Sequence, residues 1–301
     1  LGGKGRGLAF IDNIIKRHAT LNRFDNATVM IPKTVVLCTD IFEEFMDTND
    51  LYPIALSDAD DSEILAAFRN ARLPRRLLGD FLTYIEVTQS PVAVRSSSLL
   101  EDSHYQPFAG IYNTYMVPYL DDRRQMLLML SDAIKGVYAS VYFKDSKAYM
   151  QATRNVIDQE KMAVIIQEVV GQQHGMRFYP SMSGVGRSLN YYPINDERAD
   201  EGIVNLALGL GKYIVDGGLT LRVCPHHPAK VLQTSETEIA LCETQTCFYA
   251  LDLTNMGENF SIDDSFNLLR LPVKEAEQDG SLQFIASTFN AADQTIYPGI
   301  Y

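Results

Sequence analysis

The sequence has no excess of positive charge and no long apolar run, and each absence excludes a class of function. Its 301 residues include 26 lysines and arginines against 38 aspartates and glutamates, for a formal net charge of −12. This balance argues against a nucleic-acid-binding surface and against attraction to an anionic membrane. No apolar run approaches the length of a membrane span, and the N-terminus lacks the features of a signal peptide. A nucleotide is not excluded, because a few local groups suffice to bind phosphate.

Cysteine is also scarce, and its pattern argues against a zinc finger. The four cysteines are Cys38, Cys224, Cys242 and Cys247. None forms a Cys-x-x-Cys pair, and no histidine lies at zinc-finger spacing from them. Reduced thiols in a cytoplasmic protein are the simplest explanation. His226 and His227 could suggest a metal pair or a phosphohistidine, but neighbouring side chains on a strand point to opposite faces, so neither interpretation has much support.

The sequence also lacks internal repeats and low-complexity linkers, so its organisation must be inferred from periodicity and motifs. Hydrophobic residues make up 46% of the chain, which is ample for a sizeable core. Charged residues are mixed along the chain, which argues against disorder. Length alone allows one large domain or two. The sequence starts at Leu1 without a methionine, and we interpret it as a fragment of a longer polypeptide.

Residues 92–117 contain groups that suit phosphate. The apolar run Val92–Val94 predicts a buried strand, and Arg95 and three serines follow it. After Gly110, residues 111–117 predict a second strand because they are rich in Ile, Tyr, Thr and Val. The hairpin would gather a cation, hydroxyls and a glycine at its mouth. Arginine donates a fork of hydrogen bonds to phosphate oxygens, and glycine lets backbone N–H groups come close.

The same residues also allow an interpretation without a ligand. Ser98 and Glu101 have the spacing of a helix capping box, which needs no partner outside the chain. Arg95 could form an ordinary ion pair with Glu101 or Asp102. Spacing alone favours this simpler interpretation, and we keep it as an alternative to the phosphate site.

The N-terminal segment predicts a glycine turn that leads into a helix. Gly2-Gly3-Lys4-Gly5 precedes apolar residues at helical spacing, among them Leu8, Ile11, Ile14 and Ile15. A helix N-terminus with a lysine beside it is a plausible anion site. The segment is not a Walker A loop, because the spacing and the Lys-Ser/Thr end are missing.

The rest of the chain predicts a mixed scaffold of helices and strands. Helices are expected at about 41–46, over 57–90 with a break at Pro74, over 121–142, and over 269–279. Strands are expected over 29–37 with an interruption at Pro32, over 161–168 as a central strand, over 175–192 with a turn at Ser183-Gly184, and over 203–208.

Four segments resemble the phosphoenolpyruvate synthase/pyruvate phosphate dikinase family. Residues 92–117 contain Val-Ala-Val-Arg-Ser-Ser, then Glu-Asp, Phe-Ala-Gly and Thr, which is similar to the family's nucleotide-binding signature. Residues 2–8 resemble its Gly-Gly-Lys opening, and residues 163–171 its apolar strand and hinge. Residues 203–218 are similar to its Gly-Leu-Gly segment. The resemblance covers roughly residues 1–220.

The sequence departs from the family pattern at Ser98, Pro107 and Lys212, where the family has Ala, Ser and Glu. The lysine puts an acidic role at that position in doubt, and the motif does not secure the nearby acids Glu201 and Asp216. Lys212 and Pro107 motivate an alternative function, a non-catalytic nucleotide-binding regulatory module. Another alternative is a dikinase whose acceptor is not pyruvate, such as a polysaccharide or an antibiotic.

The resemblance implies an α+β fold of the ATP-grasp kind, in which two lobes hold the nucleotide. We expect residues 1–160 to form the N-terminal lobe with the phosphate-binding motifs. Residues 161–301 would form an incomplete second lobe, truncated on its C-terminal side. The family's magnesium ligands would lie beyond this chain, with Mg²⁺ bound in the full-length protein.

The resemblance also implies which residues bind ATP. Lys4 and Arg95 would contribute cations near the phosphates, and Arg95 would be the catalytic residue. Gly110 and Thr114 would contribute donors near the phosphates, and Ser96 and Gly211 would also belong to the nucleotide site. The hinge would comprise Gln167, Glu168, Val169 and Val170. The backbone of Glu168–Val170 would bond the adenine edge, and Val169 or Val170 would pack on its face.

The reaction implied by the resemblance is transfer of a phosphoryl group from ATP to a histidine on a swivelling domain. That domain would then phosphorylate pyruvate to give phosphoenolpyruvate. The phosphohistidine domain and the pyruvate-binding domain would be partners in the parent polypeptide, located in the cytoplasm. Catalysis on the ATP side rests mostly on positioning and charge neutralisation. The chain by itself is expected to be catalytically incomplete.

Overall fold

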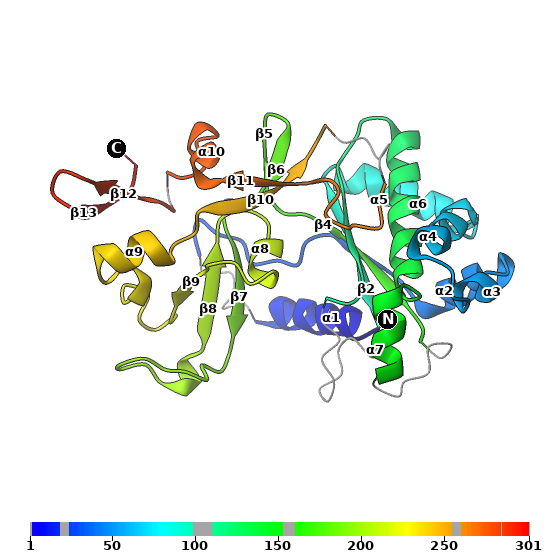
Figure 1. The fold of residues 1–301 in the computed structure, drawn as a ribbon, viewed down its shortest axis with the longest axis horizontal. Helices are drawn as coiled ribbons and strands as arrows, with labels where there is room; N and C mark the ends of the chain where they lie inside the picture. The colour runs from blue at the N-terminus through cyan, green and yellow to red at the C-terminus, as the bar shows by residue number, and fades with distance from the viewer. Residues whose placement is uncertain are drawn as a thin grey trace. The chain divides into compact units, whose positions relative to one another are not determined.

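The computed structural model describes residues 2–18, 24–98, 110–152, 160–254, 260–283 and 285–300 (Figure 1). The chain forms two compact units. Unit 1 consists of Leu1–Val169 and Asn255–Asn267, and unit 2 of Val170–Thr254 and Leu268–Tyr301. Both units contain helices and strands, which confirms the α+β class.

A four-stranded antiparallel sheet forms the centre of unit 1. Its strands, in spatial order, are β1 (Thr34–Leu37), β4 (Ala163–Glu168), β2 (Val92–Ser97) and β3 (Thr114–Val117). β4 pairs with both β1 and β2, so it is the central strand that its apolar run predicts. β2 and β3 form the predicted hairpin. β1 begins only after Pro32, because proline has no N–H to donate to a neighbouring strand.

One face of this sheet packs against helices and forms the core of unit 1. The helices are α2 (Thr39–Thr48), α3 (Tyr52–Ala55), α4 (Asp61–Asn70), α5 (Leu77–Thr88), α6 (Arg123–Ser140) and α7 (Lys144–Ala152). Helix α6 runs alongside the sheet and contacts β2, β3, α4 and α5 (Figure 1). The sheet residues in the core are Leu37, Val92, Val94, Tyr115, Val117, Val164 and Ile166.

Helix α6 lies in a long apolar helical stretch, Arg123–Ala152. By length and composition alone, Arg123–Ala152 is the one helical stretch, within the part of the chain that the structure describes, that could cross a membrane. However, 72% of its most apolar window is buried inside the protein. Its first turn is capped by Asp122, whose carboxylate accepts hydrogen bonds from two backbone N–H groups. The apolar residues of α6 therefore belong to the core of unit 1.

The described residues of unit 2 form three small antiparallel sheets and short helices. The first sheet contains β11 (Leu268–Pro272), β10 (Cys247–Asp252), β6 (Arg177–Tyr179) and β5 (Gln172–His174). The second contains β7 (Ser183–Arg187), β8 (Ile203–Ala207) and β9 (Leu221–Val223), and the third β12 (Ser287–Asn290) and β13 (Thr295–Pro298). The helices are α8 (Lys212–Val215), α9 (Thr237–Glu243), α10 (Val273–Gln278) and the 3₁₀ turns η3 (Ala199–Glu201) and η4 (Leu232–Thr234).

Two segments of unit 2 differ from the sequence prediction. Ser183 and Gly184 start β7 rather than form a turn, because they pair with Ala207 and Leu206 of β8. The predicted helix over 269–279 is helical only from Val273, and its first part is β11. A leucine-rich run fits a helix or a strand equally well, and pairing with β10 decides the outcome here.

Candidate functional site

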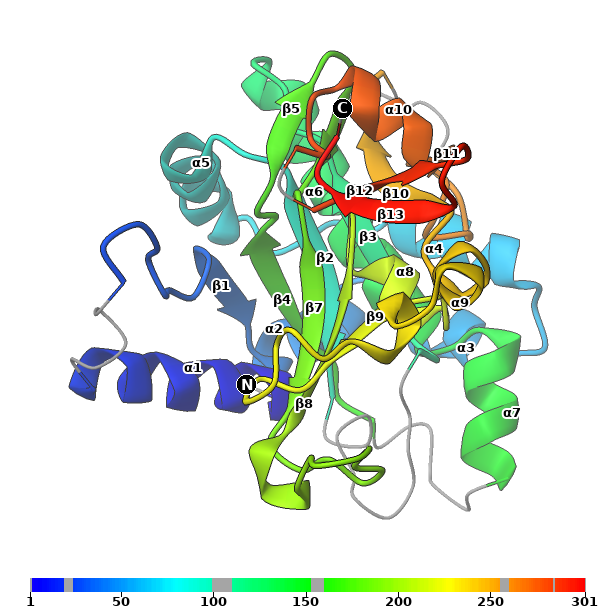
Figure 2. The ribbon, with the colours of Figure 1, turned by 90° about the vertical axis from the view of Figure 1, so that its left-hand side faces the viewer.

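The two motifs that predict a phosphate site meet in unit 1. Helix α1 (Gly2–Arg17) begins within the glycine motif itself, and its start lies beside the end of β2 (Figures 1 and 2). The Gly3 N–H donates to the Ser98 carbonyl at 3.3 Å, and the Gly5 N–H donates to Ser97 Oγ at 3.2 Å. Gly5 and Ser97 are 92 residues apart in sequence, so folding brings the two motifs together.

Residue 2, where α1 begins beside β2, must be a glycine. Gly2 has φ +64°, and a Cβ built on it would lie 1.9 Å from the Ser97 carbonyl oxygen. A side chain would therefore be strained by the backbone conformation and would overlap the end of β2. The glycine motif lets the start of α1 approach the strand, which explains its position next to the Arg-Ser-Ser segment.

We expect Gly2→Ala to release the first turn of α1 from β2. The left-handed backbone conformation alone costs about 1–2 kcal/mol for a residue with a Cβ, and the overlap with the Ser97 carbonyl adds to it. Hydrogen exchange of the segment 2–8 should be faster than in the wild type. Gly7→Ala is the matched control, because a Cβ there meets nothing within 4 Å and alanine favours the helix by about 1 kcal/mol. Equal exchange in both variants would show that Gly2 does not fix this contact.

The register of the sheet places Arg95 on the face opposite the helical core. Because alternate residues of β2 enter the core, Arg95 and Ser97 lie on the other face. Arg95 is paired with Thr114 of β3 and with Ile165 of β4. Gln167 lies two residues along β4 from Ile165 and so shares its face. We call Arg95, Ser97, Thr114, Ile165 and Gln167 together the site face.

Ser96 lies on the core side of the sheet. It is paired with Val164, whose side chain is in the core, and it is 2% exposed. The sequence prediction groups Ser96 with Arg95, but the alternation of a strand puts Ser97 there instead. Side chains alternate between the two faces of a strand, so the sequence alone could have identified Ser97, two residues after Arg95, as the serine on the same face.

The charges around the start of α1 favour an anion. Lys4 Nζ is buried within the first turn of the helix, and Arg95 is half-buried on the site face. The first turn of α1 contains no acidic residue, so the helix itself does not neutralise its positive N-terminal end. Such an arrangement suits a phosphate or carboxylate. Gly110, with φ +83°, is exposed a few residues before Thr114.

Residues 99–109 lie outside the described part of the chain. The capping box between Ser98 and Glu101, and the ion pair of Arg95 with Glu101 or Asp102, therefore fall outside the described residues. The same holds for the Phe-Ala pair before Gly110 and for Pro107. The phosphate interpretation rests on the contacts of α1 with β2 and on the site face.

The predicted hinge, Gln167–Val170, begins with the last two residues of β4. Gln167 Nε2 donates to Thr34 Oγ1 at 3.0 Å. The Glu168 N–H donates to the Lys33 carbonyl at 2.9 Å, and the Val169 N–H donates to the Pro91 carbonyl at 2.8 Å. These two N–H groups are thus used within unit 1. Unit 2 starts at Val170, a residue that is 63% exposed.

Tyr84 fixes the same end of β4. Its hydroxyl lies 3.0 Å from the carbonyl of Lys33, the residue before β1, and 3.2 Å from the Ile166 carbonyl of β4, and it can donate to either. Burial raises the pKa of Tyr84 to about 12, so the hydroxyl keeps its proton near neutral pH. The sequence places Tyr84 in a predicted helix, and no local pattern indicates this role.

The Gly-Leu-Gly segment lies in unit 2. Gly209 has φ +82°, and a Cβ there would lie 2.7 Å from the Tyr249 carbonyl oxygen. Gly211 is the residue immediately before α8. Lys212, which replaces the family's glutamate, has its Nζ 3.2 Å from the Asp216 carboxylate. Of the predicted site residues, only Val170 and Gly211 belong to unit 2, and the others belong to unit 1.

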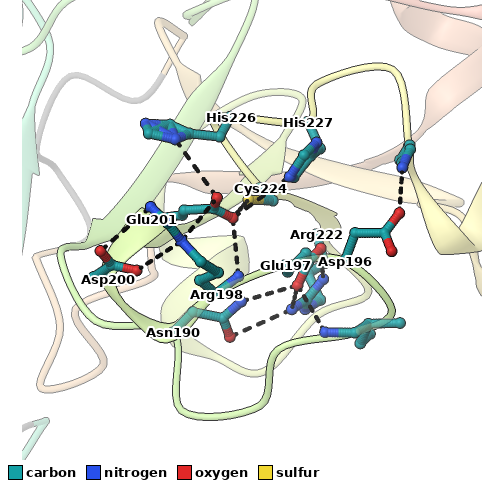
Figure 3. Close-up of polar contacts among 12 residues, drawn as sticks. Asn190, Asp196, Glu197, Arg198, Asp200, Glu201, Arg222, Cys224, His226 and His227 are labelled. Atoms are coloured by element: carbon teal, nitrogen blue, oxygen red, sulfur yellow. Dashed lines mark hydrogen bonds and ion pairs between the residues drawn. The ribbon is translucent and has the colours of Figure 1, made fainter.

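The histidine pair of unit 2 lies around Glu201 (Figure 3). His226 Nδ1 is 3.8 Å and His227 Nε2 is 3.5 Å from the Glu201 carboxylate, and Cys224 Sγ is 3.7 Å from it. The hydrogen bond from the Arg198 backbone N–H lowers the pKa of Glu201, and the two histidines add to this effect. Among the described residues, no three His, Cys, Asp or Glu side chains are arranged to hold a metal ion.

A known family matches most of the chain. Residues 1–252 match the family described as "Pyruvate phosphate dikinase, AMP/ATP-binding domain". The matched range includes the start of α1, the β2–β3 hairpin, the end of β4 and the Gly-Leu-Gly segment. These are the four segments that carry the resemblance.

Two curated relatives are similar to parts of the chain. An uncharacterized phosphotransferase, YvkC, from Bacillus subtilis (strain 168) is 28% identical over 191 residues, which is 63% of this chain and 20% of the relative. A phosphoenolpyruvate synthase from Aeropyrum pernix is 28% identical over 138 residues, which is 46% of this chain and 15% of the relative. The chain thus spans a fifth or less of the length of these relatives.

Proposed function

Because the chain belongs to the pyruvate phosphate dikinase AMP/ATP-binding domain family, we propose that it binds ATP with the phosphates at the site face of unit 1. The observation that carries this proposal is the meeting of the start of α1 with the end of β2. It joins the glycine-lysine motif to the Arg-Ser-Ser motif within one unit. A triphosphate concentrates negative charge, and this acidic chain must supply a local group of cations for it.

The proposed phosphate site combines cations with hydrogen-bond donors. Lys4 and Arg95 supply charge, and Arg95 is the catalytic residue because it would contact the transferred phosphoryl group. Ser97 and Thr114 share the face of Arg95, and Gly110 supplies a backbone N–H without a side chain in the way. Ser96 faces the core, and we leave it out of the site.

The proposed architecture is of the ATP-grasp kind, with the two units as its two lobes. The hinge is Gln167–Val170, and its support is the change from unit 1 to unit 2 after Val169. Val170 is the hinge residue whose N–H we assign to the adenine edge, since those of Glu168 and Val169 already donate within unit 1. Gly211, in unit 2, is proposed as a nucleotide-binding residue on the family resemblance alone.

In the parent polypeptide, we propose that ATP phosphorylates a histidine on a swivelling domain, which then phosphorylates pyruvate. The support is the family and the name of the Aeropyrum pernix relative, a phosphoenolpyruvate synthase. The chain's part in this reaction is to bind and orient ATP and to neutralise charge on its phosphates. The acidic composition and the four free cysteines fit a cytoplasmic location.

Among the described residues, no three acidic, histidine or cysteine side chains are arranged to hold a metal ion. Magnesium needs fewer protein ligands, because it is usually bound by one or two carboxylates together with the phosphates of the substrate. We propose Mg²⁺ only as the counter-ion that accompanies ATP, with its protein ligands elsewhere in the parent polypeptide.

Calorimetric titration of the chain with ATP tests the proposed function. We expect saturable binding of ATP and AMP, with a larger loss on Lys4→Ala for ATP than for AMP, because the lysine is assigned to phosphates that AMP lacks. Lys230→Ala is the control, since this lysine lies in unit 2 and pairs with Asp196 at the surface. Absence of adenine-nucleotide binding at millimolar concentration would contradict the proposal.

A further inference from the structure

Strand β3 is the edge strand of the unit 1 sheet, and side chains from residues 260–267 cover its outer edge. The Thr114 N–H donates to Asp264 Oδ2 at 2.9 Å, and Asn267 Nδ2 donates to the Met116 carbonyl. Thr114 and Met116 are two residues apart, which is the spacing at which an edge strand offers its groups to a neighbour. Asp264 therefore supplies the acceptor, and Asn267 the donor, that a fifth strand next to β3 would supply.

Aromatic side chains anchor this covering segment to unit 1. The ring of Phe260 lies 4.7 Å, between centroids, from that of Tyr115, whose side chain is fully buried. The Arg69 guanidinium lies 5.0 Å from the centre of the Phe260 ring. Asn113 Nδ2 donates to the Ile262 carbonyl at 2.7 Å. These contacts hold the segment in place independently of Asp264 and Asn267.

The covering segment, residues 260–267, lies in the connection that joins β10 to β11. Both of these strands are in unit 2. Residues 255–267 nevertheless belong to unit 1. The chain therefore passes between the units at residues 254–255 and 267–268 as well as at 169–170.

We propose that Asp264 and Asn267 are positioning residues that fix β3 so that Thr114 stays opposite Arg95 on the site face. The inference rests on the proposed function, because it assigns the nucleotide as the ligand that depends on this position. A slip of β3 by one residue would turn Thr114 to the opposite face. Asp264 accepts from the Thr114 N–H, and Asn267 donates to the Met116 carbonyl. Both hydrogen bonds oppose this slip, because they hold β3 on the edge that has no neighbouring strand. The β10–β11 connection thereby makes nucleotide binding in unit 1 depend on a segment that unit 2 holds at both ends.

The test combines hydrogen exchange of single amides, followed by NMR, with ATP titration of the same variants. Asp264→Ala removes the acceptor, Asp264→Asn keeps an oxygen acceptor, and Asp121→Ala changes an exposed aspartate elsewhere in unit 1. We expect Asp264→Ala to speed exchange of the Thr114 amide by roughly tenfold or more, the effect of losing a hydrogen bond to a charged group. The Tyr115 amide points toward β2 and should be unchanged, which shows that the sheet is intact.

ATP affinity should fall by about fivefold or more in Asp264→Ala, a loss comparable to one hydrogen bond. It should stay close to the wild-type value in Asp264→Asn and in Asp121→Ala. Unchanged exchange at Thr114 would overturn the covering of the edge. Faster exchange with unchanged ATP affinity would overturn the positioning role. If the wild-type chain binds no ATP, the proposed function and the nucleotide dependence both fail, and the exchange data still decide whether the edge is covered.

Discussion

Arg95→Ala should weaken ATP binding by about tenfold or more, because it removes a charged hydrogen-bond donor worth roughly 1.5–3 kcal/mol. Arg95 lies on the site face, paired with Thr114 and Ile165 and two residues before Ser97. The start of α1, with Lys4, contacts the same end of β2. In the parent polypeptide, phosphoryl transfer from ATP should fall by at least the same factor, since the arginine is assigned to the transferred group.

Two further variants separate this role from a general effect of charge. Arg95→Lys keeps the positive charge but loses the fork of donors, so affinity should lie between those of Arg95→Ala and the wild type. Arg123→Ala removes an arginine that pairs with Glu86 at the surface of unit 1. It should leave ATP affinity unchanged. Wild-type affinity in Arg95→Ala would favour the alternative in which Arg95 only pairs with a local carboxylate.

The sequence predicts this site as far as local patterns extend. The apolar run before Arg95, the β-rich residues 111–117 and the run that forms β4 predict a hairpin and a central strand, and the structure confirms both. To predict that Arg95 and Thr114 lie on the same face, one also needs the register between β2 and β3. This register depends on the length of the connection between the two strands. The alternation within β2 was sufficient to choose Ser97 over Ser96.

The parts that the sequence does not predict depend on contacts between distant segments. The docking of Gly2 on Ser97 and the bond of Thr114 to Asp264 join residues far apart in the chain, and neither has a local signature. Tyr84 looks like any aromatic residue of an amphipathic helix until its hydroxyl is found between β1 and β4. Short leucine-rich segments such as β11 fit either a helix or a strand. Pairing with a neighbouring strand, here β10, decides which of the two forms.

Arg222→Ala should destabilise unit 2 by about 2–3 kcal/mol, between the costs for exposed and for fully buried ion pairs, because the Arg222 side chain is 21% exposed. Arg222 on β9 donates to both oxygens of Glu197, at 2.9 and 2.7 Å, and the Glu197 side chain is only 7% exposed (Figure 3). Glu197 also accepts from Asn190 Nδ2 and from the Ile194 N–H. It therefore ties the segment before η3 to β9. Without Arg222, a largely buried carboxylate loses its cation.

Lys230→Ala is the matched control for this ion pair. Lys230 pairs with Asp196 at 2.8 Å, but both side chains are more than 60% exposed, and such surface pairs contribute about 0–1 kcal/mol. Urea unfolding followed by circular dichroism, together with hydrogen exchange in β7, β8 and β9, should show a large loss for Arg222→Ala and a small one for Lys230→Ala. Equal losses would contradict a special role for the Arg222–Glu197 pair.

The effect of Arg222→Ala should also depend on pH. The Arg222 guanidinium, with the Ile194 N–H and the Asn190 amide, lowers the pKa of Glu197 from 4.5 to about 2, against the opposing effect of burial. A carboxyl whose pKa is lower in the folded state stabilises that state fully above its unfolded-state pKa, and the stabilisation is lost as the pH falls toward the folded-state value. The difference in unfolding free energy between the wild type and Arg222→Ala should therefore be constant from neutral pH down to about pH 5 and shrink below that. A difference that stays constant down to about pH 3 would show that Glu197 is not the group through which Arg222 stabilises unit 2.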